Sequence, residues 1–238
     1  MKKITKILTL IVSLALIAVY FLPVWDISLD APQYPEGLGM KIWINTIEGD
    51  LQTINGLNHY IGMKTIEPDS IKELKIMPYL LGVLILLGLM AGITGKKKLL
   101  ALWVIVFVLF GIAGGIDFYI WEYDYGHDLN PEAAIKVPGM SYQPPLIGSK
   151  ELLNFTAYSY PDNGGIILIA GGIIAVLMFL YEIKYNKFVK NKLIEKNESK
   201  SVNNINYTAD DVRFMQYGPG ADKLRVGPMR KLQNDYYR

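Results

Sequence analysis

The chain has no cysteine and only two histidines among its 238 residues. Without thiols it cannot form disulfides, thiolate metal sites, iron–sulfur clusters or attached c-type haem. Its 24 basic and 22 acidic residues give a net charge of +2, which provides no electrostatic case for binding nucleic acid. Any folded part must therefore be held together by packing and hydrogen bonds.

Recognisable catalytic motifs are also missing. The sequence has no phosphate-binding loop, no HExxH and no GxSxG nucleophile elbow. No long apolar run carries Lys, Arg or Glu at its centre, which argues against an ion-coupled transporter. Neither histidine falls within such a run, which makes a haem b site improbable. We therefore expect a protein that is not an enzyme.

Hydrophobic residues make up 51% of the chain and gather in four runs, residues 4–23, 77–95, 99–119 and 165–183. A helix needs roughly 20 apolar residues to cross a bilayer, so each run predicts a transmembrane helix. The first run has the alternative of being a cleaved signal peptide. Because Leu22-Pro23-Val24-Trp25 offers no small-x-small cleavage site, an uncleaved anchor is favoured.

Lysines at the ends of these runs predict the orientation in the cytoplasmic (inner) membrane. They form three clusters, before the first run, between the second and third, and after the fourth: Lys2, Lys3 and Lys6; Lys96, Lys97 and Lys98; Lys184, Lys187, Lys190 and Lys192. Positively charged segments stay on the cytoplasmic side. Both termini are then cytoplasmic, and residues 24–76 and 120–164 form two extracytoplasmic loops. The Lys- and Asn-rich tail, residues 184–238, is expected to be cytoplasmic and largely disordered.

The first of these loops is too long and too patterned to be a simple connector. Gly37-Leu38-Gly39 predicts a turn, and the alternation over residues 40–45 predicts a short strand. Asp50 begins a predicted helix over residues 51–63. Its buried face would consist of Leu51, Ile54, Leu57 and Ile61, and a neighbouring stripe of Asn55, His59 and Met63.

Neither loop is apolar enough to fold alone, so we expect the two to pack together. The predicted fold class is an all-α membrane protein, with four transmembrane helices and a small mixed α/β extracytoplasmic cap built from two loops. Membrane lipid is then an obligatory partner.

The two predicted loops hold both histidines and three methionines, which makes a metal site worth considering. Imidazole and thioether are the ligands that hold Cu(I) without cysteine. The candidate ligands are His59, Met63, Met40, His127 and Met140. Three nearby acids would orient the imidazole rings, Asp117, Glu122 and Asp128. The alternative is structural, since methionine commonly fills gaps and histidine often satisfies a polar contact. The residues alone favour this structural role.

Asp117 lies near the end of the third apolar run. An acid at membrane depth is costly and often functional. At the edge of a span, however, its carboxylate can reach interfacial water, which favours a structural role.

Three sequence segments resemble those of a known family: residues 31–40 (APQYPEGLGM), 55–63 (NGLNHYIGM) and 136–145 (KVPGMSYQPP). The likeness, which covers residues 4–181, is to a small four-span membrane protein family of nitrous-oxide reductase (nos) gene clusters in Bacteroidetes-like bacteria. It implies a role in the maturation or activity of that copper enzyme, with a copper chaperone or maturation components as protein partners. It also raises the expectation that the candidate ligands bind copper.

Three functional hypotheses remain open. The first is an accessory membrane protein that handles copper through its cap. The second is a metal-free scaffold that docks a reductase, an electron donor or a maturation partner. Its contacts would come from aromatic residues on the cap surface: Trp43, Tyr60, Trp121, Tyr125 and Tyr142. The third is a subunit of a transporter or of a quinol-linked electron path.

Overall fold

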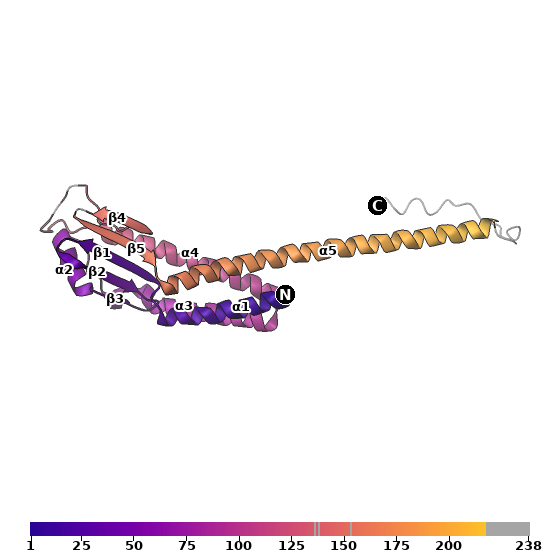
Figure 1. Ribbon diagram of the computed structural model, residues 1–238, viewed down its shortest axis with the longest axis horizontal. Coiled ribbons are helices and arrows are strands. Elements are labelled where there is room, and N and C mark those ends of the chain that lie inside the picture. The colour runs from indigo at the N-terminus through magenta and orange to yellow at the C-terminus, as the bar shows by residue number, and fades with distance from the viewer. Residues whose placement is uncertain (136, 138, 153, 218–238) are drawn as a thin grey trace. The chain divides into compact units, whose positions relative to one another are not determined.

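The computed structural model describes residues 1–135, 137, 139–152 and 154–217, with side chains described as far as residue 200. The chain divides into two units. The first is Met1–Ile183, and the second begins at Lys184. The first unit contains a helical bundle with a small sheet at one end (Figure 1).

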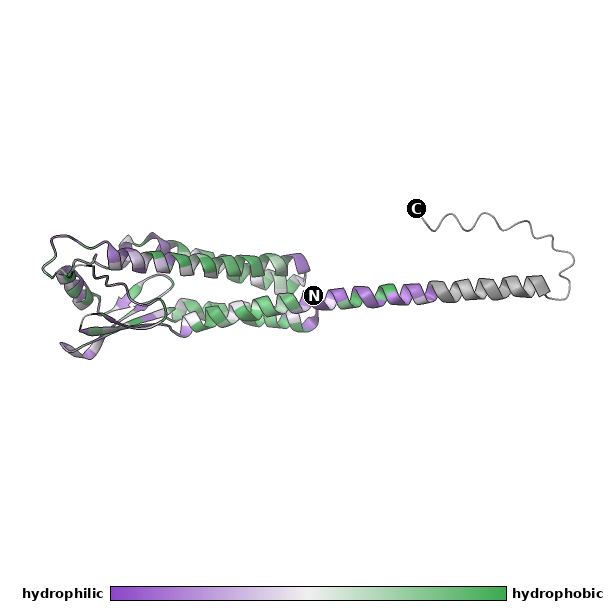
Figure 2. Cartoon of the chain, turned by 90° about the horizontal axis from the view of Figure 1, so that it is seen from above, coloured by the Kyte–Doolittle hydropathy of each residue, from purple (hydrophilic) through white to green (hydrophobic). Residues whose placement is uncertain are grey.

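Four helices of the described chain are long and apolar enough to cross a membrane. They are α1 (Lys3–Ala15) with its 3-10 continuation η1 (Leu16–Phe21), α3 (Lys72–Thr94), α4 (Lys97–His127) and α5 (Asn163–Tyr217). Figure 2 shows hydrophobic residues concentrated along these helices in the first unit. The four predicted apolar helices are therefore confirmed, and they give the chain a multi-pass membrane character.

Close packing between helices depends on small residues. A Cβ added to Gly88 of α3 would collide with the hydroxyl of Ser13 on α1 and with the indole of Trp103 on α4. The Trp103 side chain is fully buried, and its Nε1 donates a hydrogen bond to the Leu84 carbonyl oxygen at 3.1 Å. Glycine thus lets α1 and α4 approach α3, the packing that small residues provide in lipid.

A five-stranded antiparallel sheet joins the two predicted loops. Its strands are β1 (Trp25–Ala31), β2 (Tyr34–Ile42), β3 (Ile47–Gly49), β4 (Gly148–Leu152) and β5 (Phe155–Pro161), in the order β3-β2-β1-β5-β4. The central pair, β1 and β5, runs in register from Trp25 opposite Pro161 to Asp30 opposite Thr156. The two loops therefore form one folded body, as predicted, which we call the cap. Its location outside the cytoplasm stays a prediction.

Helix α2 (Leu51–Ile61) lies against the cap sheet. Ile54 is buried in a cluster with Ile27 of β1 and Met40 of β2, while Leu51, Leu57 and Ile61 are partly buried. The predicted start after Asp50 is confirmed. The Asp50 carboxylate does not cap the helix, because it accepts a hydrogen bond from the Gly39 amide at 2.9 Å instead.

The strand expected at residues 40–45 is wrong in its bounds. Strand β2 spans Tyr34–Ile42 and contains Gly37-Leu38-Gly39, the predicted turn. The chain turns earlier, at residues 32–33, between β1 and β2. Leu38 and Gly39 pair with Leu29 and Ser28 of β1, whereas Gly37 lies at an irregularity in this pairing, with φ of 74°. A local pattern does not show that pairing partner.

Helix α4 continues past the expected start of the second loop at residue 120 and ends only at His127. Phe118, Trp121 and Tyr125 recur at helical spacing on α4 and pack against the apolar cluster of the cap. The last turns of α4, residues 121–127, thus belong to the cap rather than to a loop.

The second unit is described as far as Tyr217, and its residues from Lys184 continue helix α5. This differs from the largely disordered tail expected from the sequence. Residues 190–200 (KNKLIEKNESK) include several good helix formers, Lys, Leu and Glu, which accounts for the difference. The remainder of the expected tail, residues 218–238, lies outside the described residues.

Candidate functional site

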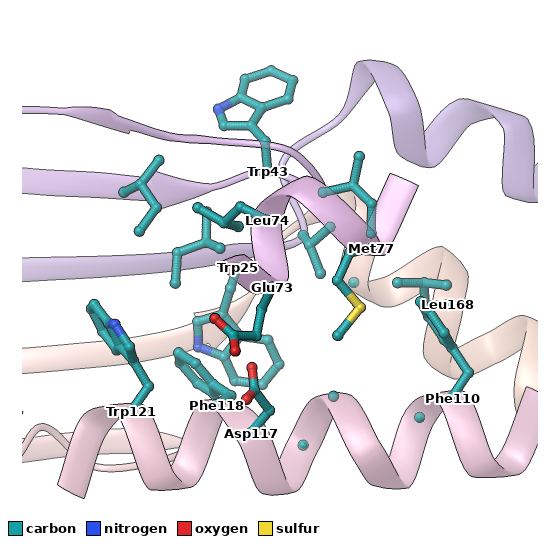
Figure 3. Close-up of a pocket in the computed structure, with 18 of the residues that line it drawn as sticks. Trp25, Trp43, Glu73, Leu74, Met77, Phe110, Asp117, Phe118, Trp121 and Leu168 are labelled. Carbon is teal, nitrogen blue, oxygen red and sulfur yellow. The ribbon is translucent and has the colours of Figure 1, made fainter. Parts of the chain in front are cut away.

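A cavity of about 410 Å³ lies where the cap meets the membrane helices, and we call it the junction cavity. Its walls come from the sheet, from the start of α3, from α4 and from α5, and they include Trp25, Met77, Phe110 and Leu168 (Figure 3). Almost all of its lining is apolar. A concave apolar site of this volume is in the range that binds small molecules or lipid chains.

Two acids interrupt the apolar lining of the junction cavity. Glu73, in the first turn of α3, and Asp117 of α4 point toward one another across it (Figure 3). Within the described part of the chain, neither carboxylate has a hydrogen bond or an ion pair. The two acids are 44 positions apart, and only the antiparallel course of α3 and α4 brings them together.

A second cavity, of about 330 Å³, lies inside the cap between the sheet, α2 and the last turns of α4, and we call it the cap cavity. Met40 of β2, Met63 and Asn58 of the α2 region, and Tyr142 are among its lining residues. Trp121 of α4 lines both cavities.

Glu122 lies beside the cap cavity, beyond the apolar run of α4. Its side chain is 0% exposed. Among the described residues, no hydrogen-bond partner reaches either of its carboxylate oxygens, the Tyr142 hydroxyl or Trp121 Nε1, all of which are buried. Burial raises the pKa of Glu122 to about 8. The carboxyl group is therefore mostly protonated at neutral pH, because no cation among the described residues compensates for its desolvation.

Two of the five predicted copper ligands share a cavity. Met40 is 5% exposed and belongs to the apolar core of the cap, and Met63 is partly buried. Both line the cap cavity, whereas His59, His127 and Met140 are not among its lining residues. The structure thus brings together two thioethers from the predicted set and leaves both imidazoles outside the same cavity.

The two histidines occupy exposed positions. His59 lies on α2, with its ring edge toward Tyr60 at a centroid distance of 6.2 Å. His127 ends α4 and stacks on Tyr123, with centroids 4.0 Å apart and planes 17° apart. Its Nδ1 lies 3.0 Å from the Tyr123 carbonyl oxygen. Since a carbonyl only accepts, Nδ1 carries the proton and Nε2 remains available.

The predicted helical stripe of Asn55, His59 and Met63 is broken at its last member. Helix α2 ends at Ile61, and Gly62 takes a left-handed conformation with φ of 82°. The Met63 amide then donates back to the Asn58 carbonyl oxygen at 2.9 Å. Because the chain turns at Gly62, His59 and Met63 do not present ligands from one helix face.

The acids proposed to orient the imidazoles have other surroundings. Asp128 and Asp124 both form ion pairs with Lys64, at 2.8 and 2.7 Å, and hydrogen bonding to these carboxylates raises the pKa of the lysine. Asp117 faces Glu73, and Glu122 has no partner among the described residues. No group of three or more His, Cys, Asp or Glu side chains suited to a metal ion occurs in the described chain.

Reasoning from the sequence named Glu122 only as an acid that would orient an imidazole and missed its burial, and it missed Glu182 altogether. Glu122 lies at helical spacing with Phe118, Trp121 and Tyr125, a signal that continuing the helix beyond residue 119 would have exposed. Glu182 of α5, at the other end of the bundle, accepts hydrogen bonds from Thr5 Oγ1 at 3.1 Å and from the Lys2 amide at 3.3 Å. It joins α5 to α1, a structural role.

Most of the aromatic residues proposed as docking contacts are not exposed to solvent. Tyr142 is only 2% exposed, and Trp43, Trp121 and Tyr125 are partly buried. Of this set, Tyr60 alone is exposed, at 57%. A different aromatic row is exposed on α4, where Tyr119, Tyr123 and His127 follow one another at four-residue spacing.

Comparison with known proteins leaves the family of this chain open. No protein-family model matches the chain, and no curated protein matches it.

Proposed function

We propose that this chain is a non-enzymatic accessory protein of the nitrous-oxide reductase system, which holds a rigid cap on the outer face of the cytoplasmic membrane and docks a protein partner there. The resemblance of three sequence segments to the family described above supports the assignment to that system. The lysine clusters support the orientation, with both termini cytoplasmic. The partner is the copper chaperone or another maturation component of the reductase.

One observation carries the docking role: an exposed aromatic row on α4. Tyr119 and Tyr123 are each 49% exposed, and the Tyr123 ring stacks on His127. The row extends along α4 from the end of the apolar run into the cap. Stacked rings lose little freedom on binding, and tyrosine is enriched among the residues that dominate interface energies.

Charge beside this row favours a basic contact surface on the partner. Asp124 and Asp128 share the single ammonium group of Lys64, so this cluster has one net negative charge. Both carboxylates are more than half exposed. A partner that carries lysine or arginine next to an apolar patch would match both features.

Co-purification tests the docking role. The tagged full chain, produced together with the copper chaperone of the reductase system, is expected to retain the chaperone after detergent extraction. Tyr123→Ala with His127→Ala should lower the retained amount about tenfold, the loss expected when a contact worth roughly 1.4 kcal/mol is removed. Tyr160→Ala, which removes an equally exposed ring from β5, serves as the control. Equal retention in all three proteins would contradict the docking role.

Copper handling is the second candidate function, and the shared position of Met40 and Met63 in the cap cavity favours it. Thioethers are soft ligands that prefer Cu(I). Replacing both by leucine keeps the side-chain volume and removes the sulfur atoms. A Cu(I) competition titration should show binding by the native protein, no binding by Met40→Leu with Met63→Leu, and full binding by Met140→Leu. If the double variant keeps its copper affinity, the site assignment is wrong.

A further inference from the structure

The junction cavity is open on a flank of α4 that is otherwise apolar. Gly111 and Gly115 are exposed, and a Cβ added to Gly111, Gly114 or Gly115 would meet no atom within 4 Å. Ile112, which follows Gly111, and Ile116, which follows Gly115, are each more than half exposed. A membrane helix with this surface has lipid as its surroundings, so the glycines leave a gap through which a lipid chain can enter the cavity.

The cap end of the same cavity is acidic. Glu73 and Asp117 face one another, and neither has an ion pair or a hydrogen bond in the part of the chain that the structure describes (Figure 3). The lysines adjacent to Glu73 on α3, Lys72 and Lys75, are not among the residues that line the cavity. Glu73 is exposed and Asp117 is partly buried. Two carboxylates that face one another disfavour each other's charged form, and a cation between them relieves that repulsion.

We propose that the junction cavity binds an amine-bearing phospholipid. Its acyl chain lies along the glycine wall of α4 toward Phe110 and Leu168, and its ammonium group lies between the carboxylates of Glu73 and Asp117. The ammonium group supplies the missing positive charge, and it also suits the aromatic lining that Trp25 and Phe118 provide. The proposal does not depend on the docking role.

Two other occupants fit the cavity less well. A quinol could donate hydrogen bonds to the acids, but it has no positively charged group to place between the two carboxylates. A hard metal cation such as Mg²⁺ or Ca²⁺ needs about six oxygen ligands. Glu73 and Asp117 are the only side chains with carboxylate oxygens among the described lining residues, whose surface is otherwise almost wholly apolar.

Competition between two lipids tests this proposal. The full chain is placed in nanodiscs that contain equal amounts of phosphatidylethanolamine and phosphatidylcholine with identical acyl chains. Native mass spectrometry after release into detergent then counts the lipids that stay bound. We expect about fivefold enrichment of phosphatidylethanolamine, as a partly exposed ion pair worth about 1 kcal/mol would give. The bulkier, methylated head group of phosphatidylcholine cannot donate hydrogen bonds to the acids.

Two variants test the contributions of the lipid head group and of the acyl chain separately. Glu73→Gln with Asp117→Asn should abolish the preference and leave the protein carrying either lipid. Gly114→Leu places a side chain in the open space of the cavity and should remove both lipids. The controls are Glu132→Gln with Glu151→Gln, which neutralise two exposed acids elsewhere, and Val108→Leu on an exposed face of α4. Both controls should bind lipid like the native protein.

Several outcomes would overturn the proposal. Equal binding of the two lipids by the native protein would remove the role of the acids, as would a preference that survives in the neutralised variant. A bound isoprenoid quinone that neither lipid displaces would assign the cavity to that class instead. If the double variant does not fold, Glu73→Gln alone, at an exposed position in the first turn of α3, must still lower the enrichment.

Discussion

Glu122 illustrates how the surroundings of one residue set its chemistry. It is fully buried in the cap and has no hydrogen-bond partner among the described residues, and burial raises its pKa to about 8 from the ordinary 4.5. In the unfolded chain the same group would ionise near its ordinary pKa. Between these two values the folded protein binds the additional proton, so stability falls as pH rises.

Glu122→Gln should reduce this dependence. The amide has nearly the same shape and stays neutral, so the variant is expected to gain stability relative to the native protein as pH rises from 5 to 8. Thermal unfolding of the detergent-solubilised protein at pH 5, 7 and 8.5 measures the difference, which should reach roughly 5 °C at the highest pH. Glu132→Gln, at an exposed position, should show no such trend. If the melting temperature of the native protein does not fall as pH rises, the protonated state of Glu122 is contradicted.

At the scale of elements, the close approach of α1, α3 and α4 depends on where the glycines lie. Gly88 has the Ser13 hydroxyl and the Trp103 indole in the space that a Cβ would occupy, whereas Gly111 has nothing within 4 Å. The two residues look alike in sequence, since each is a glycine within an apolar run. They differ because one is at a helix–helix contact and the other faces open space.

Alanine substitutions should separate these two roles. Gly88→Ala is expected to destabilise the bundle by about 1–3 kcal/mol, because Ser13 and Trp103 must move and the Trp103 hydrogen bond to Leu84 is strained. Gly111→Ala should be neutral or slightly stabilising, since alanine favours the helix. Resistance of the purified protein to unfolding in denaturing detergent measures both effects. Equal behaviour of the two variants would rule out close packing at Gly88.

At the scale of the whole molecule, the pairing of β1 with β5 connects the two halves of the first unit. Beyond the backbone ladder, Trp25 Nε1 donates to Ser159 Oγ at 2.8 Å, and Lys41 Nζ pairs with Asp162 at 2.8 Å. Both side-chain contacts link segments more than 100 positions apart. The cap therefore needs both loops. Strand β1 follows closely on η1, which ends at Phe21, and β5 leads directly into α5.

An engineered disulfide tests this pairing, because the chain has no cysteine of its own. Ser28 lies opposite Tyr158, and residues opposite one another on paired strands are about 5 Å apart at Cα, within disulfide range. Ser28→Cys with Tyr158→Cys should lose both free thiols on mild oxidation, as measured by alkylation and mass spectrometry. Ser28→Cys with Ser149→Cys spans two strand spacings, roughly 10 Å, and should stay reduced. Oxidation of the control pair and not the test pair would show a different strand order.

The sequence by itself determined the four apolar helices and the start of α2. Apolar length and helix start signals are local properties, which stay readable whatever the rest of the chain does. Tertiary structure alone decided the facing of Glu73 and Asp117, the shared cavity of Met40 and Met63, and the separation of the two histidines from it. Each depends on segments far apart in the chain, and no local pattern records which distant strand pairs with β1 or how far α4 extends into the cap.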